Sequence, residues 1–342
     1  MTAGARMTVR EGLVRTSSGA LHVMGLTGAL ARLAGYVRRT AGVTVLTFHR
    51  VNDEDDPFFP AVPTAVFENH VAHLARHYDV LTIEEAAERL QARRAPRNGL
   101  AITFDDGYRD NLTQAAPILA RHGIPATIFL ATGHIGTGIP MWFDRVAQAL
   151  KTTEADAVVL GAGRPLELSS RSSRLVALQA ALAHLKSLPD LERRRALDRL
   201  VATLAPRPFP DAERVMLDWS GVGEIRRLGF SVGAHTISHP ILSQVTAEQA
   251  WTEISGSKST IERMLGEPVR AFAYPNGGAE DYTPAVVAQV RDAGFLCALT
   301  TRHGVNTATT PRFELRRGSP GIGRGHVPTF AVKLAYYRLA HS

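Results

Sequence analysis

Apolar runs alternate with amphipathic segments along most of the chain. From Val43 onward, short apolar runs rich in β-branched residues are each followed by polar residues and then by a segment with apolar positions three or four apart. The runs predict buried strands and the segments predict helices. The expected strands are residues 43–48, 80–82, 100–104, 126–130, 230–234, 269–274 and 296–301. The expected helices are residues 67–77, 83–93, 111–122, 247–265 and 284–293, the second of them begun by a capping box of Thr82 and Glu85.

The alternation of strands and helices predicts an α/β fold made of parallel βαβ units. About seven strands favour a (β/α) barrel over an open doubly wound sheet. Between about residues 151 and 214 the alternation gives way to helical periodicity rich in Leu, Ala and Arg, which predicts a helical insertion. We therefore expect an N-terminal helical leader at 1–40, a barrel at 41–320 that carries this insertion, and a C-terminal helical tail at 321–342.

The N-terminal segment has apolar residues at helical spacing with one polar face. It lacks the continuous apolar core of an export signal, and no stretch reaches the roughly 18 apolar residues of a membrane-spanning helix. The pattern predicts a helix that packs on the domain. The alternative is a helix on a membrane surface, with Arg32, Arg38 and Arg39 facing anionic lipid. We expect the protein in the cytoplasm or at the periphery of the membrane.

The chain is basic, with a formal net charge of +7 and a sequence pI near 9.9. Such a positive net charge can favour binding to nucleic acid, to an anionic membrane or to an acidic polymer. However, the sequence has 35 arginines and only 4 lysines, a skew typical of GC-rich coding, and no helix-turn-helix, RNP or zinc-finger pattern is present. We expect no nucleic-acid partner. Cys297 is the one cysteine, which excludes an intramolecular disulfide and a cysteine-based zinc site.

Two segments at predicted strand ends carry candidate chemistry. Asp105 and Asp106 follow the strand 100–104, and adjacent carboxylates repel each other unless they share a cation or a proton. His235 and His239 follow the strand 230–234, and if that segment is helical both rings lie on one face. Each segment alone can be an ordinary turn or a chance histidine pair. Together, one Asp and two His form a divalent-metal triad with room for water.

These motifs resemble those of a known family. TFDDGY at 103–108, HTISHP at 235–240 and FAYPNG at 272–277 are similar to successive motifs of the polysaccharide deacetylases, the NodB-homology group of carbohydrate esterase family four. The resemblance runs from about residue 43 to residue 320. It implies a distorted (β/α)7 barrel and metal-dependent removal of N-acetyl groups from the amino sugars of a glycan.

The resemblance also implies roles for individual residues. Asp105 corresponds to the general base, Asp106, His235 and His239 correspond to the metal ligands, and the backbone N–H of Asn276 would meet the oxyanion. Zinc suits a His₂Asp site, and cobalt and nickel follow the same ligand rules.

Two departures from the common family pattern point to one subgroup. Ala273 stands where many members have an arginine that orients the base, and the C-terminal L-x-x-H motif that supplies the acid is missing. The segment FHRV at 48–51 resembles the Y-H-x-[IV] segment of the poly-N-acetylglucosamine deacetylases, in which the acid histidine comes from the N-terminal side of the barrel. We therefore expect His49 to be the general acid; the alternative is a histidine that caps a strand end.

Other side chains are candidates for substrate contact or for support of the site. Arg316 and Arg317 are candidates to hold a carboxylate near the site, although the sequence does not place them. The residues considered for substrate contact are Tyr274, Pro275, Tyr108 and Trp142. For Trp142 core packing is the favoured interpretation, because Trp is highly buried on average.

The function that these features favour is N-deacetylation in bacterial envelope polysaccharide metabolism. Two alternatives remain open at this point: an amidohydrolase or deacylase for a small or lipid-linked substrate, and a non-catalytic carbohydrate-binding barrel. The sequence indicates no oligomeric state.

Overall fold

The structure is a computed structural model that describes residues 41–209, 215–319, 330, 331 and 334. The expected leader at 1–40, with its proposed membrane contact, lies outside the described residues, and so does most of the expected tail. None of the described helices combines the length and the apolar character needed to cross a membrane.

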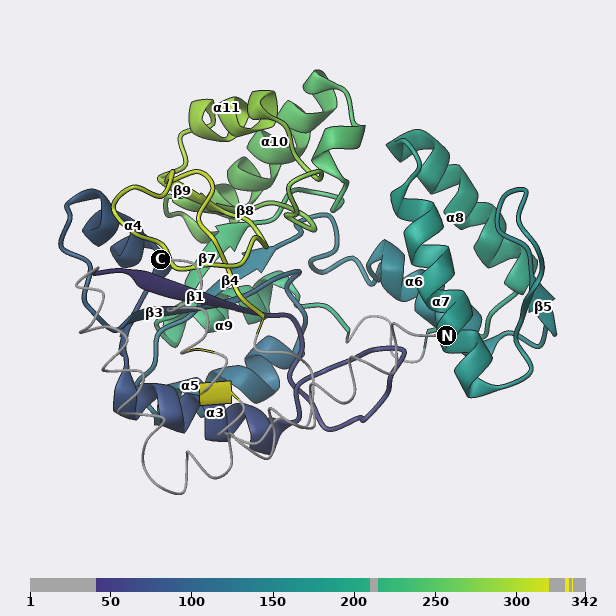
Figure 1. Ribbon diagram of the computed structural model, residues 1–342, viewed down its shortest axis with the longest axis horizontal. Helices are drawn as coiled ribbons and strands as arrows, with labels where there is room; N and C mark the ends of the chain where they lie inside the picture. The colour runs from purple at the N-terminus through teal and green to yellow at the C-terminus, as the bar shows by residue number, and fades with distance from the viewer. Residues whose placement is uncertain (1–40, 210–214, 320–329, 332–333, 335–342) are drawn as a thin grey trace, which may run out of the picture.

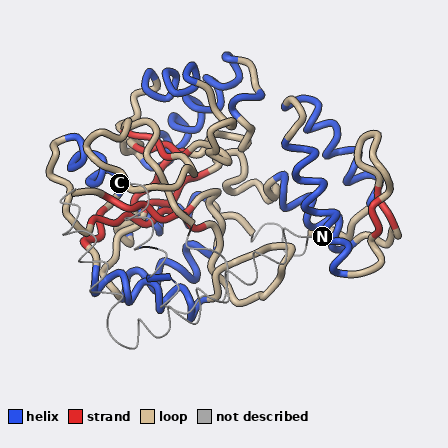
Figure 2. The backbone as a smooth tube through the Cα atoms, viewed as in Figure 1, coloured by secondary structure: helices blue, strands red, loops and turns tan. Residues whose placement is uncertain are grey.

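A parallel sheet of seven strands forms the centre of the molecule (Figures 1 and 2). The order is β1-β3-β4-β7-β8-β9, and β2 pairs with the first half of β3. All seven expected strands are present: β1 Val43–Phe48, β2 Asp79–Leu81, β3 Gly99–Phe104, β4 Thr127–Leu130, β7 Ser231–Ala234, β8 Ala271–Ala273 and β9 Cys297–Leu299. β1 and β3 are buried at every position, as expected for parallel strands covered on both faces.

The sheet curls into a half-barrel, and a segment near the end of the described chain spans its open side. Leu315 forms a parallel bridge with Leu299 of β9, and Gly318 forms one with Leu46 of β1. The amide of Gly318 donates to the carbonyl of Val45 over 2.8 Å. Residues 315–318 therefore take the place of a further strand, and the expected distorted (β/α) barrel is confirmed.

Helices connect the strands and cover the outside of the sheet (Figure 2). α4 begins with the expected capping box of Thr82 and Glu85, and α10 begins with a second one of Thr246 and Gln249. α10 ends at Gly266, whose φ of 70° is the left-handed cap that glycine accepts most easily. These elements are α3 Thr64–His77, α4 Ile83–Gln91, η1 Asn111–Ala115, α5 Ala116–Arg121, α9 Trp219–Arg227, η3 Leu242–Gln244, α10 Ala247–Leu265 and α11 Pro284–Asp292.

A helical unit lies between β4 and β7, beside the barrel in Figure 1. It consists of α6 Trp142–Thr152, the small hairpin of β5 Ala157–Val158 and β6 Leu166–Glu167, α7 Arg171–Lys186 and α8 Asp190–Leu204. Its hydrophobic core is separate from that of the barrel and also contains Phe58 and Phe59 from the loop after β1. The unit starts earlier than residue 151 because α6 packs against α7 and α8. The division into leader, barrel and tail stays a prediction.

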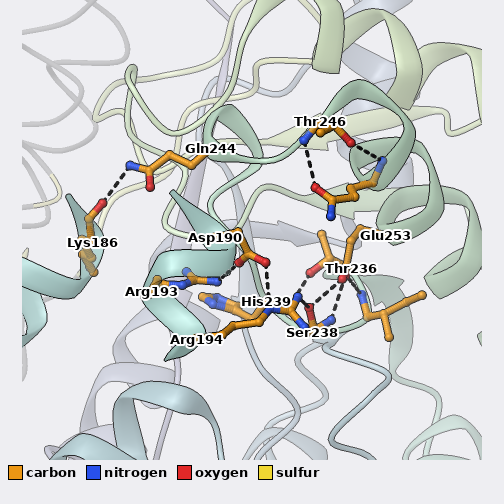
Figure 3. A network of polar contacts seen from close by, with 12 residues as sticks. Lys186, Asp190, Arg193, Arg194, Thr236, Ser238, His239, Gln244, Thr246 and Glu253 are labelled. Atoms are coloured by element: carbon orange, nitrogen blue, oxygen red, sulfur yellow. Dashed lines mark hydrogen bonds and ion pairs between the residues drawn. The ribbon is translucent and has the colours of Figure 1, made fainter. Parts of the chain in front are cut away.

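Hydrogen bonds attach the helical unit to the loops at the top of the barrel. Figure 3 shows Arg194 of α8 beside the loop after β7, where its Nη2 donates to Oγ of Ser238 over 3.1 Å. Gln244 of η3 donates from Nε2 to the carbonyl of Lys186 over 2.8 Å. The helical unit and the loop that carries His235 and His239 are thereby held at a fixed spacing.

Candidate metal and catalytic site

The structure brings the three expected metal ligands together at the carboxyl ends of β3 and β7. Oδ1 of Asp106 lies 3.6 Å from Nε2 of His235 and 3.5 Å from Nε2 of His239. One ligand atom from each residue lies within 4.8 Å of the other two. Two ligands of a tetrahedral zinc ion are about 3.3 Å apart, given bond lengths of about 2.0–2.1 Å. The observed spacings are close to that value and longer than good hydrogen bonds.

The carboxylate of Asp106 lacks a protein partner. Both of its oxygens are buried without a hydrogen bond among the described residues. Nδ1 of His235 lies 2.7 Å from the carbonyl of Ala273, which fixes the proton on Nδ1 and leaves the Nε2 lone pair free. Because buried polar atoms are normally paired, these donors fit a bound cation.

The electrostatics of the triad agree with a cation site. Burial, and then the charges of Asp105 and Asp144, raise the pKa of Asp106 well above its usual range. Burial lowers the pKa of His235 to about 4 and that of His239 well below its ordinary value. The imidazoles are therefore neutral, which is the form that binds metals. A divalent cation between the three side chains would remove the cost of ionising Asp106.

Backbone strain is concentrated at the site. Seven described non-glycine residues have positive φ angles, and four of them lie in the sequence motifs: Asp106 at 76°, Thr236 at 68°, His239 at 54° and Asn276 at 58°. Such conformations are costly and persist where the surroundings enforce them. The sharp turn after Asp106 also needs Gly107, with a φ of 87°, because a Cβ atom there would lie 2.9 Å from side chains of Leu130 and Ile135.

The segment from His235 to His239 is a loop and not a helical turn. The two rings converge because Thr236 and His239 adopt left-handed conformations, so the helical geometry considered for the histidine pair is not the one that forms. Glu253 of α10 holds this loop (Figure 3): its carboxylate accepts hydrogen bonds from the amides of Ile237 and Ser238 at 2.7 and 2.8 Å and from the Ser238 hydroxyl at 2.6 Å.

Asp105 lies beside the triad but is bound by a different partner. Nη1 of Arg317 donates to Oδ1 of Asp105 over 2.7 Å, and Arg317 is fully buried. Burial alone would raise the pKa of Asp105, but the charges of Arg317, His235 and His49, together with the Arg317 hydrogen bond, lower it to about 2. The Arg317 side chain also donates to the carbonyl of Thr300 and to the hydroxyl of Thr103. Asp105 is therefore a fixed, ionised carboxylate.

His49 lies directly after β1 and lines the same cavity as Asp105. His49 is exposed, while its backbone carbonyl accepts a hydrogen bond of 2.8 Å from Asn111. Asn111 begins a π-helical turn, a feature often found at functional sites. Enclosure by protein lowers the pKa of His49, the charge of Asp105 opposes this effect, and Arg317 adds to it.

Asn276 also lines the cavity, in the turn after β8. Its Nδ2 is a buried donor without an acceptor in the described structure, and its carbonyl accepts from the Thr301 hydroxyl over 2.6 Å. Gly277 must follow it, because a Cβ atom at that position would lie 2.9 Å from the amide of Thr301.

The residues expected to contact substrate are not all at the cavity. Tyr108 lines it and donates from its hydroxyl to Oδ2 of Asp144 over 2.8 Å. Trp142 is packed in the core of the helical unit, with Arg193 over its ring. Tyr274 is fully buried, donates to the carbonyl of Phe313 and stacks on Tyr282.

Within the described structure the cavity lining includes neither Trp142 nor Tyr274 nor Pro275. Direct substrate contact by these three residues is therefore without support. Phe143 takes the place expected for Trp142: it lines the cavity, and its ring centroid is 5.5 Å from that of His239.

Glu253 was not identified from the sequence, since a glutamate on an amphipathic helix is usually a solvated charge. Replacing it by alanine should remove three hydrogen bonds to the loop, and loss of such outer partners typically lowers metal affinity about 10–100-fold. Titration calorimetry with zinc would measure the change. Glu248→Ala, at an exposed position on the same helix, is the control and should bind zinc as the wild type does. Equal zinc affinity for the Glu253→Ala and wild-type proteins would contradict this role.

Comparisons with known proteins agree with the site. The family model described as polysaccharide deacetylase matches residues 92–297. The Bacillus subtilis protein YxkH, assigned to the polysaccharide deacetylases, is 22% identical over 288 residues, which is 83% of this chain and 74% of that protein.

Among solved structures, the Streptococcus pyogenes deacetylase PplD in complex with acetate has a TM-score of 0.58 at 18% identity, covering 86% of this chain and 99% of its own. IcaB from Ammonifex degensii has a TM-score of 0.54 at 20% identity, covering 87% and 97%. At these identities the structures support the fold. The family model spans more than half of the chain, and the motifs at 103–108 and 235–240 both contribute residues to the site described above. The chain therefore belongs to the polysaccharide deacetylase family and is a hydrolase of the N-deacetylase type.

Proposed function

We propose that this protein removes N-acetyl groups from the amino sugars of a glycan in a bacterial envelope polysaccharide pathway, with Asp105 as the general base and His49 as the general acid. The observation that carries the proposal is the different treatment of two adjacent carboxylates. Asp105 is ionised by Arg317, and Asp106 is left for a cation with His235 and His239. The relative PplD was solved with acetate, which is the product of such a reaction.

The proposed cofactor is a divalent metal held by Asp106, His235 and His239. Zinc is the metal that this donor set favours, with cobalt and nickel as alternatives. When bound, such an ion supplies a Lewis acid for the amide carbonyl and lowers the pKa of the attacking water.

Asp105 would accept the proton of that water. Arg317 occupies its Oδ1, and the contact of 3.4 Å from the Thr47 hydroxyl leaves Oδ2 largely free. A carboxylate with a pKa of about 2 is a weak base, so it can take a proton only from a water that is itself acidified.

His49 would donate a proton to the departing amine. The resting imidazole is neutral because its pKa is lowered, so the proton must arrive from the cavity water or by way of Asp105, whose charge favours the imidazolium. The backbone N–H of Asn276 would stabilise the oxyanion, as its position in the YPNG turn suggests. Its unpaired Nδ2 offers a second donor to the substrate.

The retained base and the complete triad argue against a barrel that only binds carbohydrate. Peripheral membrane contact through residues 1–40, and a place in the cytoplasm or at the membrane surface, remain proposals from the sequence. The basic charge suits an anionic glycan or membrane as a neighbour, without a nucleic-acid partner.

The first test is acetate release from N-acetylglucosamine oligomers by the zinc-loaded protein. Asp105→Asn should lower kcat about 10²–10⁴-fold, the usual contribution of a general base, and should leave zinc binding intact. His49→Gln should lower kcat with little change in zinc affinity. Failure of the zinc- or cobalt-loaded wild type to release acetate from any amino-sugar polymer would reject the proposal.

Arg317→Met tests whether Arg317 lowers the pKa of Asp105. A carboxyl group with a lowered pKa stabilises the folded state above its ordinary pKa of 3.8, and this contribution disappears as the pH falls towards 2. Without Arg317 the pKa of Asp105 should rise. The acidic limb of the profile of kcat/KM against pH should therefore shift to higher pH. Loss of one partner of a buried pair should also cost about 3–5 kcal/mol in the free energy of unfolding.

Arg317→Lys is the matched control for the Met substitution. It keeps the charge, so its acidic limb should lie closer to that of the wild type even if its stability falls. Identical pH profiles for the wild type and Arg317→Met would contradict the assigned role of Arg317.

A further inference from the structure

The catalytic groups occupy one end of a longer cavity. A single cavity of about 470 Å³ is lined at one end by the metal triad, Asp105 and His49. It continues to the helical unit, where Phe143 of α6 lies between the ring of His239 and the apolar side chains of that unit. A single ligand can therefore bind in the part of the cavity beside the helical unit and at the catalytic groups at the same time.

Two apolar walls enclose this far part. One wall is residues 57–62 in the loop after β1, which contribute the apolar side chains of Pro57, Phe58, Phe59, Pro60 and Val62. The other is α7, with Leu175, Leu178 and Leu182 spaced three and four residues apart on one face. This leucine face is about 10 Å long at 1.5 Å per residue. We call the space between residues 57–62 and these three leucines the apolar groove.

The groove is held in place by polar contacts outside it. Nζ of Lys151 on α6 contacts Oδ2 of Asp56 at 2.6 Å and lies over the ring of Phe59. The amide of Phe58 donates to Oδ1 of Asp56 over 3.0 Å. The second wall is fixed by the hydrogen bond of Gln244 to the last turn of α7. The walls therefore exist before any ligand binds.

The lining decides what the groove can hold. A sugar ring carries several hydroxyl groups, and a buried hydroxyl without a partner is costly. Residues 57–62 offer no polar side chain, and α7 adds Gln179 and Lys186 to its three leucines. Elsewhere the cavity lining also includes Arg50, Tyr108 and Asp144. An alkyl or acyl chain needs no partner and gains free energy from every methylene group that leaves water. The lining therefore fits an apolar chain better than a second sugar.

We propose that the substrate is amphiphilic: an N-acylated amino sugar that carries an apolar chain of several carbons, with the amide at the metal triad and the chain in the apolar groove. This proposal rests on the amide cleavage of the proposed function and specifies its substrate class. A chain carried on nitrogen would replace the acetyl group of the proposed function by a longer acyl group. The chain is carried either by the acyl group on nitrogen or by the aglycone, and the two sources are distinguished by the substrates below.

The test compares kcat/KM for N-acetylglucosamine, octyl N-acetylglucosaminide and N-octanoylglucosamine with the zinc-loaded protein. One methylene group buried is worth about a fourfold gain, so burial of three or four should give the preferred amphiphile roughly a 100-fold advantage over N-acetylglucosamine. An advantage of the octyl glycoside places the chain on the aglycone, and an advantage of the octanoyl compound places it on nitrogen.

Groove variants connect that advantage to the structure. Leu182→Gln should reduce the advantage of the preferred amphiphile over N-acetylglucosamine at least tenfold and leave kcat/KM for N-acetylglucosamine unchanged. Gln179→Leu should increase the same advantage. Val176→Gln is the matched control, since Val176 is on the same helix but is 60% exposed and outside the cavity lining. No gain for either amphiphile, or an equal loss for all three substrates in Leu182→Gln, would overturn the proposal.

Binding separates this proposal from the proposed function. Calorimetry of the two amphiphiles with zinc-loaded Asp105→Asn and its Leu182→Gln double variant measures the groove without turnover. Tighter binding of an amphiphile than of N-acetylglucosamine, weakened by Leu182→Gln, supports the groove even if no amide is cleaved. Equal affinities reject the groove, while absence of turnover in the wild type rejects the proposed function.

Discussion

The buried ion pair of Arg317 and Asp105 is the interaction on which the site depends. Two aspartates follow each other at the end of β3, and two neighbouring buried carboxylates cannot both be ionised without compensation. Arg317 compensates the first of them at 2.7 Å. The second, Asp106, has no protein partner for its oxygens among the described residues and faces two neutral imidazoles. One residue is thus a fixed anion, and its neighbour is left as a candidate metal ligand.

The closure of the barrel makes the pairing of Arg317 with Asp105 possible. Arg317 belongs to the segment that bridges β9 to β1, so the closure of the sheet and the position of the guanidinium have the same cause. The amide of Asp105 donates to the carbonyl of Phe48, which joins the ends of β1 and β3 and sets His49 beside Asp105. On the other side, Glu253 holds the strained loop of His235 and His239. Each functional side chain is therefore positioned by a contact far away in sequence.

This explains what the sequence could and could not predict. The strands and most helices follow from the local periodicity of apolar residues, and the capping box follows from the spacing of Thr82 and Glu85. The structure confirms these predictions. The triad was predictable because its residues follow strands whose carboxyl ends share one edge. Arg317 could be named but not placed, because its position depends on barrel closure. Glu253 carried no signal, since its partners are backbone amides of a distant loop.

The differences between expectation and structure have similar causes. A helical turn is one geometry in which a spacing of four brings His235 and His239 together, but hydrogen bonds from the loop to α10 favour left-handed conformations instead. Trp142 and Tyr274 are candidates for substrate contact on their sequence position, with core packing the favoured interpretation of Trp142. Both are buried, and Phe143 and Asn276 line the cavity. Whether a side chain points into a core or into a cavity depends on packing that a single sequence does not contain.

The most direct measurement of the central claim is a crystal structure of the zinc-equilibrated protein with anomalous data collected on both sides of the zinc absorption edge. The account predicts one strong peak, bonded to a carboxylate oxygen of Asp106 and to Nε2 of both His235 and His239, with Asp105 still paired to Arg317 and outside the coordination shell. A peak bonded to Asp105, or no peak between these three side chains, would contradict it.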